Sequence, residues 1–175
     1  MKINSKKNIK NNRKHSRKNV RKNKRSGKNV GKYSRKNVMR GGVLSDYVEG
    51  IIRSVGNNVL TLTILDIQGN FFCDEGAKQL AKALKKNTNI ITLNISSNDI
   101  HVAGAKAIAE ALIVNKTLTT LNIGNNNIGP EGAKAITGAL ETNKASALTT
   151  LDISNNNIGE GGAVAIAGVL NSIEA

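Results

Sequence analysis

Residues 118–129 read LTTLNIGNNNIG, and this stretch decides the fold because the chain contains four copies of it. The other copies read LTILDIQGNFF, IITLNISSNDI and LTTLDISNNNIG and begin at residues 62, 90 and 148. Their central leucines, which are 28, 28 and 30 residues apart, are Leu65, Leu93, Leu121 and Leu151. A nearly fixed period of this length is typical of a solenoid, in which each repeat stacks on its neighbours.

The first half of each repeat has the pattern of a short β-strand. In the third repeat Leu121 and Ile123 alternate with polar residues, so both apolar side chains are expected to point inward. The residues between them point outward, are mostly small and polar, and form the candidate partner-binding surface. These outward positions are Ile64, Asp66, Gln68, Thr92, Asn94, Ser96, Thr120, Asn122, Gly124, Thr150, Asp152 and Ser154.

An asparagine follows each predicted strand at the turn that leaves it. An asparagine amide offers two N–H donors and an acceptor oxygen, so stacked copies can bond to the turn backbone of neighbouring repeats. We expect a structural ladder of four buried side chains that pairs polar groups inside the turns. Its members are Asn70, Asn98, Asn126 and Asn156.

The second half of each repeat has helical periodicity. In the second repeat Ala105, Ile108, Ala109 and Leu112 fall on one face of a helix. A glycine precedes each of these segments, and no lysine of the P-loop type accompanies it. We therefore interpret the glycines as turn formers rather than as a phosphate-binding loop. They are Gly76, Gly104, Gly132 and Gly162. The small Ala and Gly positions of these segments also indicate close packing of each helix on its neighbours and on the sheet.

Two further segments precede the four repeats, which we assign to residues 60–175. Residues 1–42 contain seventeen Lys or Arg and no Asp or Glu, so we predict a disordered basic tail. Residues 43–59 are predicted to form an N-terminal capping helix, in which Val48, Ile51, Ile52 and Val55 follow helical spacing. Its apolar face is expected to cover the edge of the first strand.

The tail has three interpretations. It is a solvated extension without a partner, a nonspecific nucleic-acid-binding arm, or a segment that is not translated because the product starts at Met39. The rest of the chain has nine basic and twelve acidic residues, so the tail carries +17 and the rest −3 of the net charge of +14.

The repeated pattern, with a period of 28, resembles leucine-rich repeats of the ribonuclease-inhibitor type over residues 60–170. The resemblance implies an α/β solenoid with parallel strands on the concave face and helices on the convex face. It also implies a protein-binding role. Residues 143–148 (NKASAL) carry two extra residues relative to residues 115–118 (NKTL), and we place the insertion in the loop before the fourth strand. No polar capping repeat follows Leu170, so we expect an open strand edge that favours edge-to-edge self-association or indicates a truncated array.

The sequence gives no reason to expect an enzyme. His15 and His101 are far apart and Cys73 is the single cysteine, so we predict no catalytic residue, no metal site and no cofactor. No run of about 18 apolar residues is present, which predicts no membrane span. The expected location is the cytoplasm, with the nucleus, the nucleolus and delivery into another cell's cytosol as alternatives.

The leading hypothesis is a non-enzymatic module that binds a protein partner through the concave strands and adjoining turns. Four strands spaced by about 4.8 Å and exposing roughly five residues each give a patch of only about 300 Å². A standard interface needs about 800 Å² from each partner, so the turns or the open edge must contribute. The alternative is a nonspecific nucleic-acid-binding protein that acts through residues 1–42.

Overall fold

The computed structural model describes residues 46–58 and 63–173, with side chains up to residue 169. The predicted tail, residues 43–45 and residue 59 lie outside the described residues. The elements alternate between helix and strand along the chain. They are α2 (Asp46–Gly56), β1 (Ile64–Asp66), α3 (Cys73–Leu84), β2 (Thr92–Asn94), α4 (Val102–Leu112), β3 (Thr120–Asn122), α5 (Gly129–Thr142), β4 (Thr150–Asp152) and α6 (Gly159–Ile173).

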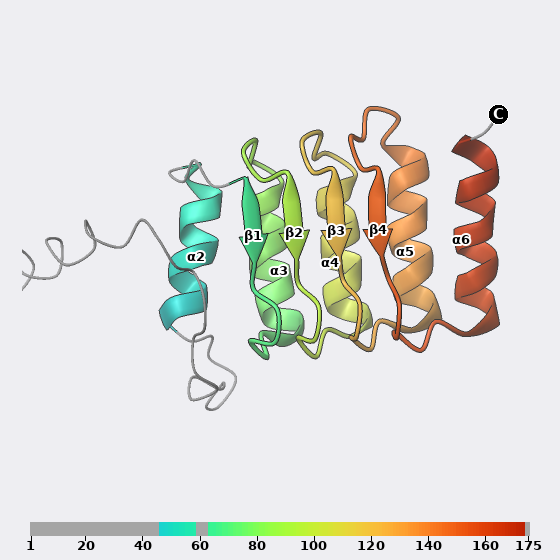
Figure 1. The fold of residues 1–175 in the computed structure, drawn as a ribbon, viewed down its shortest axis with the longest axis horizontal. Helices are drawn as coiled ribbons and strands as arrows, with labels where there is room; N and C mark the ends of the chain where they lie inside the picture. Colours follow the sequence, from blue (N-terminus) through green and yellow to red (C-terminus); the bar gives the residue numbers. More distant parts are fainter. Residues whose placement is uncertain (1–45, 59–62, 174–175) are drawn as a thin grey trace, which may run out of the picture. The chain divides into compact units, whose positions relative to one another are not determined.

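The four strands form one parallel sheet in the order β1-β2-β3-β4, and the helices lie in a second layer (Figure 1). The register pairs Leu65 with Leu93, Leu93 with Leu121 and Leu121 with Leu151, which are the leucines that define the repeat. The predicted α/β solenoid of parallel strands and helices is therefore confirmed. Each strand has only three residues. The last of the three predicted outward positions in each repeat, such as Gln68 after β1, therefore lies two residues beyond the strand.

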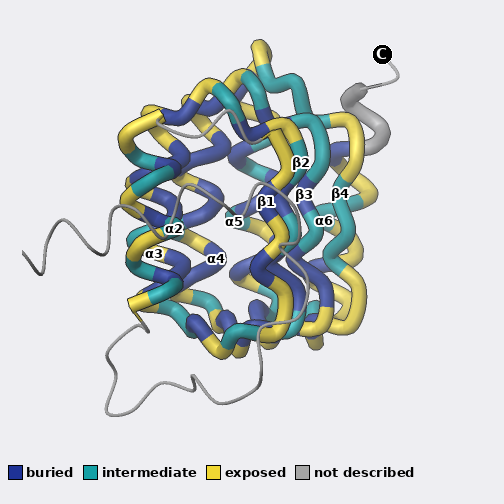
Figure 2. Tube along the Cα trace, turned by 60° about the vertical axis from the view of Figure 1, so that its left-hand side comes forward, coloured by how far each residue is buried: buried dark blue, intermediate teal, exposed yellow. Residues whose placement is uncertain are grey.

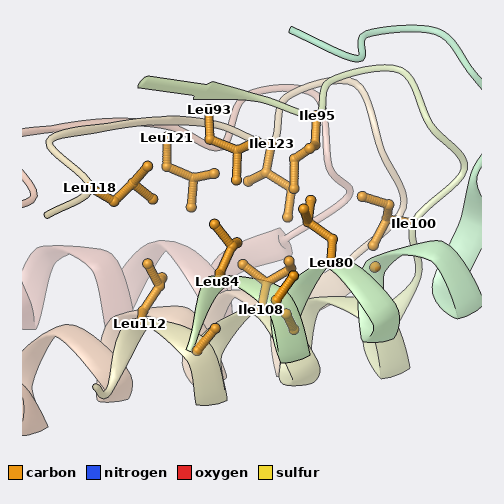
Figure 3. Close-up of a cluster of buried hydrophobic side chains, with 14 of the residues drawn as sticks. Leu80, Leu84, Leu93, Ile95, Ile100, Ile108, Leu112, Leu118, Leu121 and Ile123 are labelled. Atoms are coloured by element: carbon orange, nitrogen blue, oxygen red, sulfur yellow. The ribbon is translucent and has the colours of Figure 1, made fainter. Parts of the chain in front are cut away.

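The core lies between the two layers. Leucines and isoleucines from the strand segments point toward Leu80, Leu84 and Ile108 of the helices (Figure 3). Leu93 and Leu121 are fully buried, and exposed residues gather along the loops and outer helix faces (Figure 2). Burial of the strand leucines and isoleucines is what their alternation predicts.

Helix α2 packs beside α3 at the start of the helix layer. Three of the four predicted apolar residues, Val48, Ile52 and Val55, are buried and join the common hydrophobic core, whereas Ile51 is half-buried against it. The Asn87 side chain donates to the carbonyl oxygen of Val55 at 2.8 Å and so ties the end of α2 to the first repeat.

The recurring glycines are not turn formers, and this interpretation is wrong. Each lies in the first turn of a helix without a positive φ. A Cβ on Gly76 would lie 2.2 Å from the ring of Phe72, and one on Gly132 would lie 2.8 Å from Ile128. The glycines are needed because the helix starts against the last inward side chain of its own strand segment.

The asparagines after the second, third and fourth strands are buried and bond across repeats as predicted, whereas Asn70 is half-buried and its side-chain amide donates only within its own repeat. The Asn98 side chain donates to Ile67 O at 2.9 Å, and the Asn126 side chain donates to Ile95 O at 3.1 Å. In the other direction, Asn126 Oδ1 accepts the backbone N–H groups of Asn98 and Ile100. These side chains pair backbone groups that the turns would otherwise bury without partners.

A second row of asparagines lies at the opposite end of the strands, and the sequence reasoning missed it. Asn115 donates to Leu84 O at 2.9 Å, and Asn143 donates to Leu112 O at 2.7 Å. The carbonyls at the end of a helix have no partner within the helix, so the next repeat supplies one. The row consists of Asn87, Asn115 and Asn143, spaced by 28 residues.

The two inserted residues lie after Asn143, in the loop before β4, as expected. Asn115 Oδ1 accepts the backbone N–H of Leu118, but the longer loop moves the equivalent Leu148 away from Asn143. The hydroxyl of Ser146 accepts the Leu148 N–H instead, at 3.2 Å. The insertion therefore changes the loop and preserves the strand.

Candidate protein-binding surface

The outward residues of the strands form aligned rows across the sheet. The strand register places one row of Asp and Asn side chains side by side and a second row beside it that is threonine in three of four repeats. We call the side of the sheet that carries these rows the strand face. The first row is Asp66, Asn94, Asn122 and Asp152, and the second is Ile64, Thr92, Thr120 and Thr150.

Each member of the first row fixes the chain where it leaves the strand. Asn122 Oδ1 accepts the backbone N–H of Gly124 at 2.9 Å, and Asp152 Oδ1 accepts that of Ser154 at 3.0 Å. The same contact recurs at Asp66 and Asn94. One oxygen of each side chain thus holds the backbone, and the rest of the polar group remains available on the strand face.

Two of the expected outward residues are buried. Ser96 is 3% exposed, and its hydroxyl donates to Asn94 Oδ1 at 2.8 Å. Gly124 is buried because the Asn122 and Asp152 side chains approach it. The expectation of outward exposure is wrong for these two, whereas the other ten outward positions are exposed or half-buried.

Three side-chain oxygens converge above Gly124, and we call them the oxygen triad. Asn122 Oδ1 and the two carboxylate oxygens of Asp152 lie 3.2, 3.3 and 3.3 Å from the point where a Cβ on Gly124 would be. Hydrogen bonds from the hydroxyl and N–H of Ser154 hold the pKa of Asp152 below its usual range. The triad therefore carries a full negative charge at neutral pH.

Two exposed isoleucines lie at the other end of the strand face. Ile64 is 61% exposed and Ile91 is 37% exposed. They are neighbours across β1 and β2, because Ile64 pairs with Thr92 and the Ile91 N–H donates to Thr63 O at 2.7 Å. The sequence reasoning included Ile64 and missed Ile91, whose signal is an isoleucine at a position that is threonine in the other three repeats.

The turns beside β1 and β2 bring together ionisable side chains. Cys73 Sγ lies 3.9 Å from an Asp99 carboxylate oxygen, and the His101 imidazole lies 3.8 Å from the same residue. Burial, followed by the Asp99 carboxylate, raises the pKa of the Cys73 thiol, which makes it a poor nucleophile. Asp74 accepts the backbone N–H groups of His101 and Gly104 and so caps α4 from the preceding repeat.

Within residues 46–58 and 63–173, no group of three or more His, Cys, Asp or Glu side chains is arranged to hold a metal ion. No helix of the same described part of the chain is long and apolar enough to cross a membrane.

The fourth repeat exposes core positions that the third repeat buries. Leu121 and Ile123 are fully buried, whereas the equivalent Leu151 and Ile153 are half-buried. Ile123 N–H donates to Asp152 O in the next repeat, but no described residue accepts the N–H of Ile153. Ala163 on α6 is exposed, whereas the equivalent Ala133 on α5 is fully buried. The described residues therefore leave this end of the sheet and core uncovered.

Comparison with known families identified all four repeats. The family model described as Leucine Rich repeat matches residues 60–81, 86–109, 114–136 and 145–167. The chain belongs to the leucine-rich-repeat family. Comparison with curated proteins gave no match.

Solved leucine-rich-repeat structures share the fold. Leiomodin-1 actin-binding site 2 is 30% identical with a TM-score of 0.64, over 70% of this chain and 71% of that chain. The tropomodulin C-terminal domain of Caenorhabditis elegans is 17% identical with a TM-score of 0.63, over 73% of this chain and 75% of that chain. The second likeness shows the fold alone.

Proposed function

We propose that the chain is a non-enzymatic module that binds a protein partner in the cytoplasm through its strand face and adjoining turns. The observation that supports this most strongly is the strand face itself. Its rows hold their backbone with one oxygen of each Asp or Asn, and no described element covers the remaining polar groups or Ile64 and Ile91. Leucine-rich-repeat folds typically serve as interaction scaffolds.

Actin is the first partner to test. The 30% identity to leiomodin-1 actin-binding site 2 covers more than two thirds of both chains, so the likeness extends over the repeats rather than over one motif. The strand face also lacks the Trp, Tyr and Arg residues that often dominate interfaces, so we expect a moderate affinity that depends on several contacts.

The test places a bulky charge at the centre of the strand face. Thr120 in β3 is partly exposed, so Thr120→Arg obstructs the face without removing a core side chain. Thr142→Arg, at the exposed end of α5, is the matched control with the same change in charge and size. We expect Thr120→Arg to abolish binding to actin, or to the partners captured from cell extract, and Thr142→Arg to preserve it. Equal capture by both folded variants contradicts the proposal.

A second function concerns the tail, because seventeen basic residues without an acidic one would bind phosphate backbones. RNA retention is to be compared between residues 1–175 and 43–175 across a salt series. Nucleic-acid binding is supported if RNA retention is lost when the tail is removed and falls as the salt concentration rises. Equal retention by both contradicts it.

A further inference from the structure

The strand face has a uniform sign of charge. The four strand segments, residues 63–68, 91–96, 119–124 and 149–154, contain two carboxylates and no Lys or Arg. Asp66 and Asp152 lie at opposite ends of the first row. A partner that covers this face must therefore supply positive charge or leave two carboxylates without a counter-ion.

The oxygen triad is the part of the strand face best suited to bind a positively charged side chain of a partner. Asp152 Oδ1 is already bonded to Ser154, but Oδ2 has no hydrogen-bond partner among the described residues. Gly124 carries no side chain beside these oxygens, unlike Gln68, Ser96 and Ser154 at the equivalent positions. A lysine ammonium or an arginine guanidinium supplies several N–H donors and matches a set of converging oxygens.

The exposed isoleucines give the same face a second anchor of different chemistry. Ile64 and Ile91 are exposed on adjacent strand segments, and the residues in register with Ile64 in β2, β3 and β4 are threonines. A partner side chain that covers both isoleucines removes apolar surface from water, at about 25 cal/mol per Å². We call this pair the isoleucine anchor.

The spacing of the two anchors sets the shape of the ligand. The isoleucine anchor, measured at β1, and the oxygen triad between β3 and β4 are about two and a half strand spacings apart across the sheet. With their offset along the strands, the separation is about 14 Å. An extended peptide covers this distance in about four residues. We propose that the strand face recognises an extended peptide segment in a partner protein, with a Lys or Arg at the oxygen triad and an aliphatic or aromatic residue about four positions away at the isoleucine anchor.

This inference rests on the proposed function, because it names the partner chemistry of the same face. The experiment selects random twelve-residue peptides on the full chain and discards those that Thr120→Arg also retains. This counter-selection removes peptides that bind the basic tail. We expect the remaining peptides to share a basic and an apolar residue three to five positions apart.

Variants that copy a neighbouring repeat then test each anchor with a selected synthetic peptide. Asp152→Asn removes the charge and keeps the Oδ1 acceptor, as Asn122 does in the third repeat. Ile64→Thr copies Thr92. The control is Glu110→Gln, which removes an equal charge on α4 from an exposed ion pair with Lys85. We expect about tenfold weaker binding for Asp152→Asn and about fivefold for Ile64→Thr, with no change for Glu110→Gln.

The outcomes separate the two proposals. Peptides that depend on Thr120 but lack the basic and apolar pattern, or that bind Asp152→Asn unchanged, overturn this inference and leave the proposed function intact. If no selected peptide distinguishes the full chain from Thr120→Arg, this inference is overturned, and the capture experiment with Thr120→Arg and Thr142→Arg still decides the proposed function. Thermal unfolding of each variant checks that the fold is retained.

Discussion

The side-chain Oδ1 of Asn126 accepts the backbone N–H of Asn98 at 2.9 Å, across 28 residues of sequence. The same amide donates to Ile95 O, and its buried position excludes replacement of these bonds by bulk water. Asn126→Ala leaves turn groups unpaired, and we expect a loss of about 1–3 kcal/mol in the free energy of unfolding. Urea denaturation measures it. Asn127→Ala, one residue later and exposed, is the control with an expected cost below about 0.5 kcal/mol.

Substitution of two glycines of α5 by alanine should have opposite effects on stability. A Cβ on Gly132 would lie 2.8 Å from Ile128 and 3.0 Å from Ala105, whereas a Cβ on Gly138 would meet nothing within 4 Å. Gly132→Ala should destabilise by about 1–3 kcal/mol through overpacking. Gly138→Ala should stabilise by about 0.5–1 kcal/mol, because alanine is the better helix former. Thermal unfolding of the pair measures both, and similar shifts in the same direction would show that the close approach is not important.

Much of the fold could be predicted from the sequence, because the inward apolar residues recur at the same positions in every repeat. Leu93 pairs with Leu121 in the register that the spacing of 28 implies. The role of the glycines could not be read in the same way, because a repeated glycine fits a turn and a close contact equally well. The 2.2 Å distance between a Cβ placed on Gly76 and the ring of Phe72 shows that the glycine permits a close contact rather than a turn.

The candidate surface was less predictable than the core. Alternation predicts the direction of a side chain, but the burial of Ser96 and Gly124 depends on side chains from the adjacent residues and strands. The second asparagine row was missed because Asn115 and Asn143 lie in polar loops, where an asparagine is common without a buried role. Its spacing of 28 was the available signal.

Equivalent leucines in the third and fourth repeats should differ in their contribution to stability. Leu121 is fully buried, whereas Leu151 is half-buried. Leu121→Ala should cost about 2–5 kcal/mol, because it leaves a cavity between the layers. Leu151→Ala should cost less, because water already reaches its side chain. Chemical denaturation of the two variants measures the difference, and an equal cost would show that the end of the sheet is covered in solution.

The Asp152 carboxylate should make stability depend on pH in the acid range. Ser154 lowers its pKa in the folded chain, so the unfolded chain binds the proton more tightly. The contribution to stability is present above the unfolded pKa, near 3.8, and is lost as the pH falls through the lower folded pKa. Asp152→Asn should flatten the acid side of the curve of unfolding free energy against pH. An unchanged curve would show that Ser154 does not stabilise the ionised form.

The uncovered end of the fourth repeat predicts self-association. Leu151 and Ile153 are half-buried there, the Ile153 N–H has no described acceptor, and Ala163 is exposed although the equivalent Ala133 is fully buried. Burial of this apolar edge against a second copy removes apolar surface and pairs the open strand. Sedimentation equilibrium of the full chain should therefore show a mass that rises with concentration, and Ala163→Glu should reduce the rise. Val114→Glu, at a 50% exposed residue after α4, is the control. A monomer at every concentration, or an equal effect of both variants, contradicts an interface at β4 and α6, because of the two substituted residues Ala163 alone is at a position that the preceding repeat buries.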